Sequence, residues 1–159
     1  MANAQPKTFR PGEGRTYRLG QVTLVFKSVA DDEPGIYSVC ETTSHPGSGA
    51  GPHRYTAYEE THIVIEGKYE VQLGDEMLKL GPGEMAFMLN GVPHSRKNLA
   101  PGSGRQLVIS SPPGVFEAFI AEVVASQIDS GSPSRPGGAH DFKAIAAKHG
   151  VKCIDAPRR

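Results

Sequence analysis

The stretch that decides the fold covers residues 47–67, GSGAGPHRYTAYEETHIVIEG. It opens with glycine and proline, which favour turns, and then places polar side chains at alternate positions. His53 and Tyr55 are two residues apart, as are Glu60 and His62. Because side chains alternate across a β-strand, each pair lies on one face of its strand. If both pairs lie on the faces of their strands that are directed toward the interior, all four side chains point into one barrel.

A second stretch, residues 83–98, reads GEMAFMLNGVPHSRKN and supplies a further histidine. Asn90-Gly91 is a turn dipeptide, so His94 begins a strand directly after a turn. We expect His94 to meet the polar groups of the first stretch. Imidazole and carboxylate together suit Fe, Mn, Ni, Zn or Co, and two histidines with one carboxylate form a known oxygen-activating arrangement. The two stretches therefore indicate a metal-centred pocket.

Short apolar runs separated by glycine and proline continue on both sides of these stretches, as in an all-β protein. Residues 44–52 contain too much glycine and proline for a regular element, and residues 85–89 are apolar throughout, as in a strand buried on both faces. The expected strands cover residues 16–29 (as a pair), 35–43, 53–56, 61–66, 69–73, 76–80, 85–89, 94–99 and 106–110. This spacing favours a sandwich or barrel.

The pattern changes after Pro113. Residues 115–128 place apolar side chains at helical spacing, and residues 140–149 form a shorter helical pattern that Gly150 ends. A Ser/Pro/Gly linker at residues 130–139 separates them. We therefore expect a β-barrel over residues 1–114 and a helical tail over residues 115–159, packed on the barrel in one domain.

Composition limits the function classes. The 159 residues carry 17 basic and 17 acidic side chains, without a long basic run, so nothing favours a nucleic-acid or membrane partner. The N-terminus is polar and no apolar run reaches membrane-spanning length, which predicts a cytoplasmic protein. Cys40 and Cys153 are expected to be reduced, packed thiols. The expected partner is a small-molecule substrate.

Both stretches resemble the two sequence motifs of the cupin superfamily. The matching positions are Gly47, His53, Glu60, Gly67, Gly83, Gly91, His94 and Asn98. The resemblance, closest to small single-domain bacterial cupins and loosely to quercetin-dioxygenase-like ones, implies a double-stranded β-helix (jelly-roll) barrel with short C-terminal helices. It also implies a homodimer, formed through sheet edges or exchanged N-terminal strands.

The resemblance implies that His53, Glu60 and His94 are the ligands of a divalent metal ion (Fe, Mn, Ni or Zn). The sequence departs from the family at Tyr55, usually a second histidine, and at Leu89, usually proline. Three interpretations remain open. The three residues bind metal alone, His62 supplies a further imidazole, or the metal is lost and the pocket binds an organic ligand.

Tyr55 and His62 are the candidate catalytic residues. Tyr55 is either a donor or acid/base toward the substrate or a wall of the pocket, and His62 is either a pocket group or a hydrogen-bonded core histidine. Arg96, two residues after His94, either pairs with an anionic substrate or forms a structural salt bridge. We expect Arg54, Tyr58 and Glu59 to alternate away from the inner face. His45 is expected at the surface, with a lid over the entrance as the alternative, and His140 and His149 are expected to be structural or solvent-facing.

The resemblance implies a metal-dependent enzyme, first of all dioxygenase-like, acting on a small organic substrate, aromatic compounds included. A non-redox isomerase, cyclase or lyase and a non-catalytic ligand-binding barrel remain alternatives, because the cupin fold hosts all of them.

Overall fold

The computed structural model describes residues 7–28, 35–129 and 139–155. The expected linker at residues 130–139 lies almost entirely outside this part. In chain order the elements are β1 (Arg15–Leu19), β2 (Val22–Ser28), β3 (Ser38–Ser44), β4 (Gly49–Tyr55), β5 (Glu59–Glu66), β6 (Tyr69–Leu73), β7 (Glu76–Leu80), β8 (Met85–Met88), β9 (His94–Asn98), β10 (Gly104–Ser111), α1 (Val115–Asp129), α2 (Ala139–Lys148) and β11 (Val151–Cys153).

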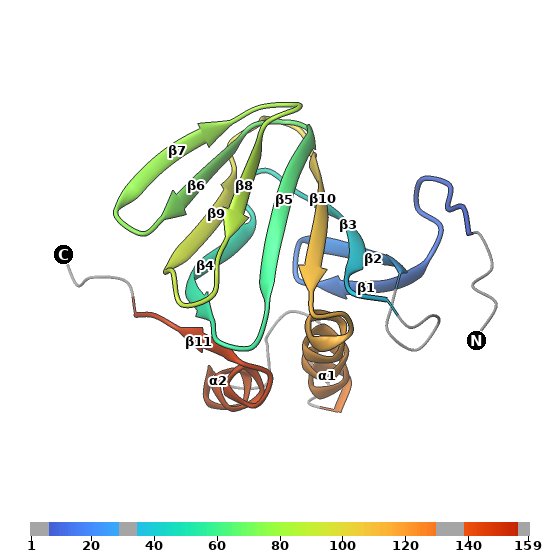
Figure 1. Ribbon diagram of the computed structural model, residues 1–159, viewed down its shortest axis with the longest axis vertical. Helices are drawn as coiled ribbons and strands as arrows, with labels where there is room; N and C mark the ends of the chain where they lie inside the picture. The colour runs from blue at the N-terminus through green and yellow to red at the C-terminus, as the bar shows by residue number, and fades with distance from the viewer. Residues whose placement is uncertain (1–6, 29–34, 130–138, 156–159) are drawn as a thin grey trace.

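The strands form two antiparallel sheets that face each other (Figure 1). One sheet has the order β1-β2-β3-β10-β5-β8, and the other has the order β11-β4-β9-β6-β7. Alternate side chains of each strand point between the sheets and form the core, as Leu24, Val64, Val71 and Val108 do. The predicted all-β jelly-roll barrel is confirmed.

Strand β4 begins inside the segment expected to be a loop. Gly49 pairs with Lys97 of β9, and a Cβ atom at Gly49 would overlap the Arg96 carbonyl oxygen. Glycine therefore lets the two backbones approach closely, which is why a glycine-rich segment forms a strand here. The pairing is irregular between Ala50 and His53, where Pro52 interrupts it.

Strand β8 is not buried on both faces, contrary to the prediction. It is the edge of its sheet, and Ala86 and Met88 point inward while Met85 and Phe87 are exposed. An uninterrupted apolar run predicts a strand buried on both faces, but it also occurs in an edge strand whose outward-facing side chains are apolar. The outer face of β8 is therefore an apolar surface.

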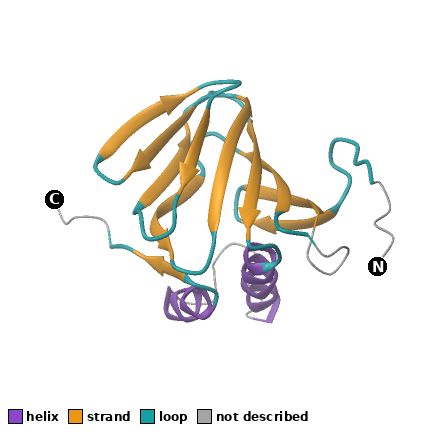
Figure 2. Ribbon diagram, in the orientation of Figure 1, coloured by secondary structure: helices purple, strands orange, loops and turns teal. Residues whose placement is uncertain are grey.

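The C-terminal segment closes one end of the barrel, where both helices lie (Figure 2). Both expected helices are present, and Gly150 follows the second with a φ of 73°. Strand β11, which the sequence did not predict, then pairs with β4 and places Val151 opposite Tyr55 and Cys153 opposite His53. The tail therefore extends the sheet that carries part of the predicted site.

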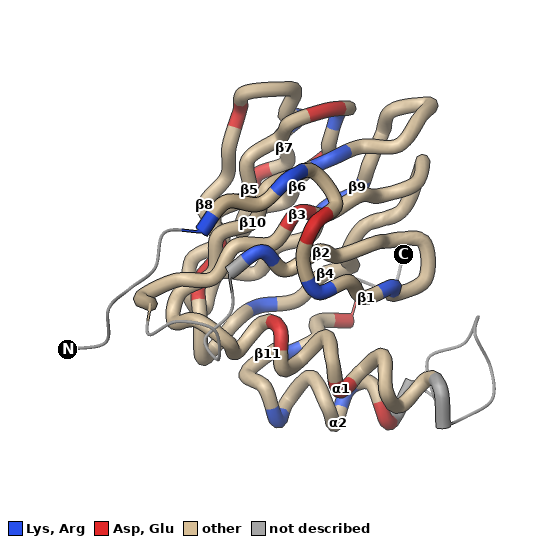
Figure 3. Tube along the Cα trace, turned by 90° about the vertical axis from the view of Figure 1, so that its right-hand side faces the viewer, with Lys and Arg blue, Asp and Glu red and all other residues tan. Residues whose placement is uncertain are grey.

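Charged residues of both signs are interspersed along the trace (Figure 3), in keeping with the zero formal net charge. Cys40 and Cys153 are free. Within the described ranges, no helix combines the length and apolarity needed to cross a membrane.

Candidate active site

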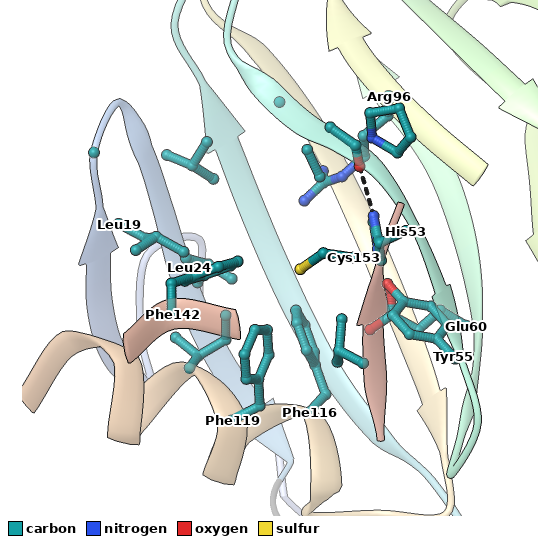
Figure 4. A pocket seen from close by; sticks show the side chains of 18 of the residues that line it. Leu19, Leu24, His53, Tyr55, Glu60, Arg96, Phe116, Phe119, Phe142 and Cys153 are labelled. Carbon is teal, nitrogen blue, oxygen red and sulfur yellow. Dashed lines mark hydrogen bonds between the residues drawn. The ribbon is translucent and has the colours of Figure 1, made fainter. Parts of the chain in front are cut away.

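A cavity of about 470 Å³ lies between the sheets and the C-terminal helices (Figure 4). Most of its wall is apolar and comes from β1, β2, α1, α2 and β11. Its polar wall comes from the middle of the barrel, where His53, Tyr55, Glu60 and Arg96 line it. The cavity thus brings together an apolar region and part of the predicted site.

His53 of β4 and His94 of β9 face each other directly across the sheet. Their Nε2 atoms are 3.1 Å apart. The Nδ1 atom of His53 lies 2.7 Å from the Gly51 carbonyl oxygen, and that of His94 lies 2.9 Å from the Val92 carbonyl oxygen. Because a carbonyl oxygen only accepts hydrogen bonds, both Nδ1 atoms carry the proton.

The two Nε2 atoms therefore present lone pairs to each other. Burial lowers the pKa of His53 despite its bond to Gly51, and burial together with His53 lowers the pKa of His94 to about 4. Both rings are neutral at pH 7, so neither Nε2 has a proton to share. Two lone pairs at this distance repel each other unless a cation lies beside both.

The separation fits two ligands of one metal ion. Two nitrogen atoms about 2.1 Å from an ion, at right angles to each other, lie about 3.0 Å apart. The Nε2 atoms of His53 and His94 match this value. The bonds from Nδ1 to backbone carbonyls also fix the tautomer and ring orientation, as in known metal sites.

Glu60 of β5 is buried, and other side chains hold its carboxylate. Tyr55 Oη donates to Oε2 at 2.7 Å, and His62 Nε2 lies 2.7 Å from the same oxygen. Ser110 Oγ donates to Oε1 at 3.2 Å. A carboxylate accepts about four hydrogen bonds, so Oε1 retains acceptor capacity.

These bonds keep Glu60 ionised. Burial raises its pKa, but the hydrogen bond and charge of His62 and the hydrogen bond from Tyr55 outweigh that effect and hold the pKa below its usual value. Burial and the nearby Glu60 charge raise the pKa of Tyr55 well above its usual value. Tyr55 is therefore a neutral phenol that donates to a carboxylate.

The structure thus places the five predicted site residues in two connected groups. His53 and His94 converge, and Tyr55, whose ring packs 4.5 Å from that of His94, joins them to Glu60 and His62. In the described part of the chain, no set of three His, Cys, Asp or Glu side chains is arranged to hold a metal ion. His62 is buried, lies outside the cavity wall, and has no partner for Nδ1 among the described residues.

Tyr58, expected to point away, lines the cavity and is buried. Strand β4 ends at Tyr55 and β5 begins at Glu59, so the bend between them breaks the alternation. Glu59 is exposed and accepts a bond from the Asn90 amide, and Arg54 is not part of the wall.

The sequence did not predict that the C-terminal tail contributes to the cavity. Phe116, Phe119, Phe142 and Cys153 all line it. The helical spacing of the three phenylalanines indicated a buried face, but no spacing rule relates that face to residues of the barrel.

Residues 41–110 match a family model described as the cupin domain. The chain has the cupin fold. Among similar solved structures, KdgF from Halomonas sp. has a TM-score of 0.60 and 18% identity over 68% of this chain and 94% of that one. A predicted oxalate decarboxylase from Thermotoga maritima has a TM-score of 0.61 and 16% identity, and the match covers 66% of this chain and 98% of that one.

The polyketide cyclase RemF from Streptomyces resistomycificus has a TM-score of 0.58 and 23% identity, over 69% of this chain and 83% of that one. At such identities the likeness shows the cupin fold alone. A comparison with curated proteins gave no significant match.

Proposed function

We propose that this chain is a cupin enzyme that binds a divalent metal ion through His53 and His94. Glu60, held by Tyr55 and His62, provides the acid–base group, and the substrate is a small, mainly apolar organic molecule. One observation carries the proposal. Two neutral imidazoles direct their Nε2 lone pairs at each other, and one of them, His53, lines an apolar cavity together with the buried, ionised carboxylate of Glu60.

This arrangement is unfavourable for a purely structural barrel. Burying an ionised carboxylate is costly unless hydrogen bonds or a cation compensate, and each unpaired polar atom adds to that cost. Apolar side chains at residues 53, 60 and 94 would fill a core without it. A site with a function explains why polar groups occupy these positions.

The residues of the chain have distinct roles in this proposal. The bound metal would act as a Lewis acid toward a substrate oxygen. Tyr55 and His62 hold Oε2 of Glu60. Among the described residues Oε1 accepts a bond from Ser110 alone, so Oε1 is the atom that takes a proton from the substrate. The apolar wall excludes water from these groups.

This acid–base group favours a non-redox isomerase, cyclase or lyase over the dioxygenase-like reaction. The oxygen-activating arrangement needs two histidines and a carboxylate as one ligand set. In the residues that the structure describes, hydrogen-bond donors hold the Glu60 carboxylate, and no three-residue set is formed.

Metal titration of chelator-treated protein tests the proposal. We expect one equivalent of Mn²⁺, Ni²⁺ or Zn²⁺ to bind by calorimetry, and His53→Ala or His94→Ala to weaken binding by at least about 100-fold. His45→Ala is the matched control, because His45 is exposed and lies outside the site. Unchanged affinity in His94→Ala would remove that residue from the site and overturn the proposal.

A second measurement separates the two reaction types. Glu60→Gln should keep the metal stoichiometry and abolish turnover of any substrate found, because the amide cannot take a proton from the substrate. Turnover by the wild type should proceed equally under nitrogen and under air. Oxygen uptake coupled to turnover would favour the dioxygenase-like reaction instead.

A further inference from the structure

We propose that the substrate is a monoanionic carboxylate with an apolar, ring-bearing body. Arg96 takes the carboxylate, and the aromatic wall supplied by α1 and α2 takes the ring. This inference rests on the proposed function, since it names the substrate class of the same cavity.

Arg96 provides the first part of the evidence. It lines the cavity from β9 and is partly buried, and its Nη1 donates to Gln106 Oε1 at 2.7 Å. Within the described ranges, no carboxylate lies at ion-pair distance from its guanidinium group, so the structural salt bridge considered from the sequence is not formed there. A guanidinium has five N–H donors in a planar fork, so most remain for a ligand.

The chemistry of Arg96 selects the head group. An arginine fork matches a carboxylate with two parallel hydrogen bonds. It is the only Lys or Arg in the cavity wall of the described residues. A carboxylate carries one charge and therefore costs less to bury in a mainly apolar cavity than a doubly charged phosphate.

The rest of the wall selects the body of the molecule. Phe116, Phe119 and Phe142 enter from the helices, opposite the labelled polar residues (Figure 4). Tyr58 stacks on Tyr55 with ring centroids 4.2 Å apart and continues the aromatic surface toward Phe116. Aromatic walls favour rings in offset or edge-on contact. A volume of about 470 Å³ is in the range of small-molecule sites.

Three probes test the two halves of the inference separately. These are 3-phenylpropanoate, the neutral 3-phenylpropan-1-ol, and propanoate, which lacks the ring. Calorimetry on the purified full chain should show that 3-phenylpropanoate binds at least about tenfold more tightly than either other probe, because only it uses both regions.

Single-residue variants show which side chains cause the preference for the acid and for the ring. Arg96→Gln should abolish the preference for the acid over the alcohol, and Arg96→Lys should keep part of it, since a charge without the fork remains. Lys97→Gln is the matched control, because Lys97 is the exposed next residue of β9. Phe119→Leu, which keeps an apolar side chain, should weaken both ring-bearing probes alike.

Metal content measured on the same samples distinguishes the two proposals. If the wild type binds one metal ion but binds acid and alcohol equally, or binds neither at millimolar concentration, the carboxylate inference is overturned and the proposed function is not. If the wild type binds no metal ion, the proposed function fails whatever the probes show. An acid preference that survives Arg96→Gln overturns the role of Arg96.

Discussion

Two stacked tyrosines in the site differ in one property, the partner of the hydroxyl group. Tyr55 and Tyr58 are both buried, and each ring packs against the other. The Tyr55 hydroxyl donates to the Glu60 carboxylate, whereas the Tyr58 hydroxyl has no hydrogen-bond partner among the described residues. Removing each hydroxyl group in turn separates the contribution of a charge-assisted hydrogen bond to stability from the contribution of a buried hydroxyl group without a partner.

Tyr55→Phe should lower the free energy of unfolding by about 1–3 kcal/mol, because it leaves Glu60 with one donor fewer. Tyr58→Phe should change it by less than about 0.5 kcal/mol, or raise it, because no bond is lost. Urea unfolding followed by circular dichroism measures both. Equal losses in the two variants would show that Tyr55 Oη does not stabilise the carboxylate.

Strand β11 forms a short edge of the sheet that carries part of the site. Its three residues cover the edge of β4, the strand that carries His53 and Tyr55. Val151 is buried opposite Tyr55, while its neighbour Lys152 is exposed. Because side chains alternate on a strand, these two positions report the inner and outer faces of one short element.

Val151→Ala should lower the free energy of unfolding by about 1–3 kcal/mol, through lost apolar burial and the resulting void. Lys152→Ala should change it by less than about 0.5 kcal/mol. Denaturant unfolding at pH 7 tests the pair. If Val151→Ala is as stable as the wild type, β11 does not pack against the barrel in solution.

Charged residues link three neighbouring strands of the larger sheet. Glu41 of β3 is 3.2 Å from Nζ of Lys27 on β2 and 2.8 Å from Nη2 of Arg105 on β10. Burial raises the pKa of Glu41. The hydrogen bonds and charges of Arg105 and Lys27 have the larger effect together and hold the pKa below its usual value.

A lowered pKa in the folded state stabilises the fold above the unfolded-state pKa of Glu41, and this contribution disappears as the pH falls through the folded-state value. Glu41→Gln should therefore cost about 1–3 kcal/mol at pH 7 and distinctly less at pH 3. Urea unfolding at the two pH values measures the difference. A loss that is the same at both would show that the ion pairs do not stabilise the sheet.

At the scale of the whole molecule, one sheet edge carries an apolar strip that is exposed to solvent. Met85, Phe87 and Leu89 are exposed on and just after β8, and Ile63 of β5 pairs with Met85 beside them. An exposed edge strand with an apolar face favours association with another chain, and a zero net charge adds little repulsion. We propose that a second copy of the chain covers this strip in a homodimer.

Phe87→Glu should shift the protein to a monomer in light scattering at micromolar concentration, because it places a charge in the proposed interface. Met77→Glu is the control, since Met77 is equally exposed but lies on β7 of the other sheet. A wild-type protein that is monomeric at high micromolar concentration would contradict the dimer.

The sequence predicted those features that depend on local rules. The turn at Gly74-Asp75 gave β6 and β7 their bounds, and the two-residue spacing placed His53 and Tyr55 on one strand face. The features it missed depend on contacts distant along the chain. Tyr58 enters the cavity because a bend breaks the alternation, and Gly49 belongs to a strand because of its closeness to Arg96.

The division of the cavity wall has a consequence for how such proteins diversify. The groups proposed for chemistry lie on barrel strands, whereas Phe116, Phe119 and Phe142 come from the C-terminal segment. Substitutions in the tail can therefore change which compounds enter while the reacting groups keep their geometry. Exchanging residues 115–155 between homologous chains is then a route to new substrate ranges with the same chemistry, and a survey of such tails would be a survey of specificities.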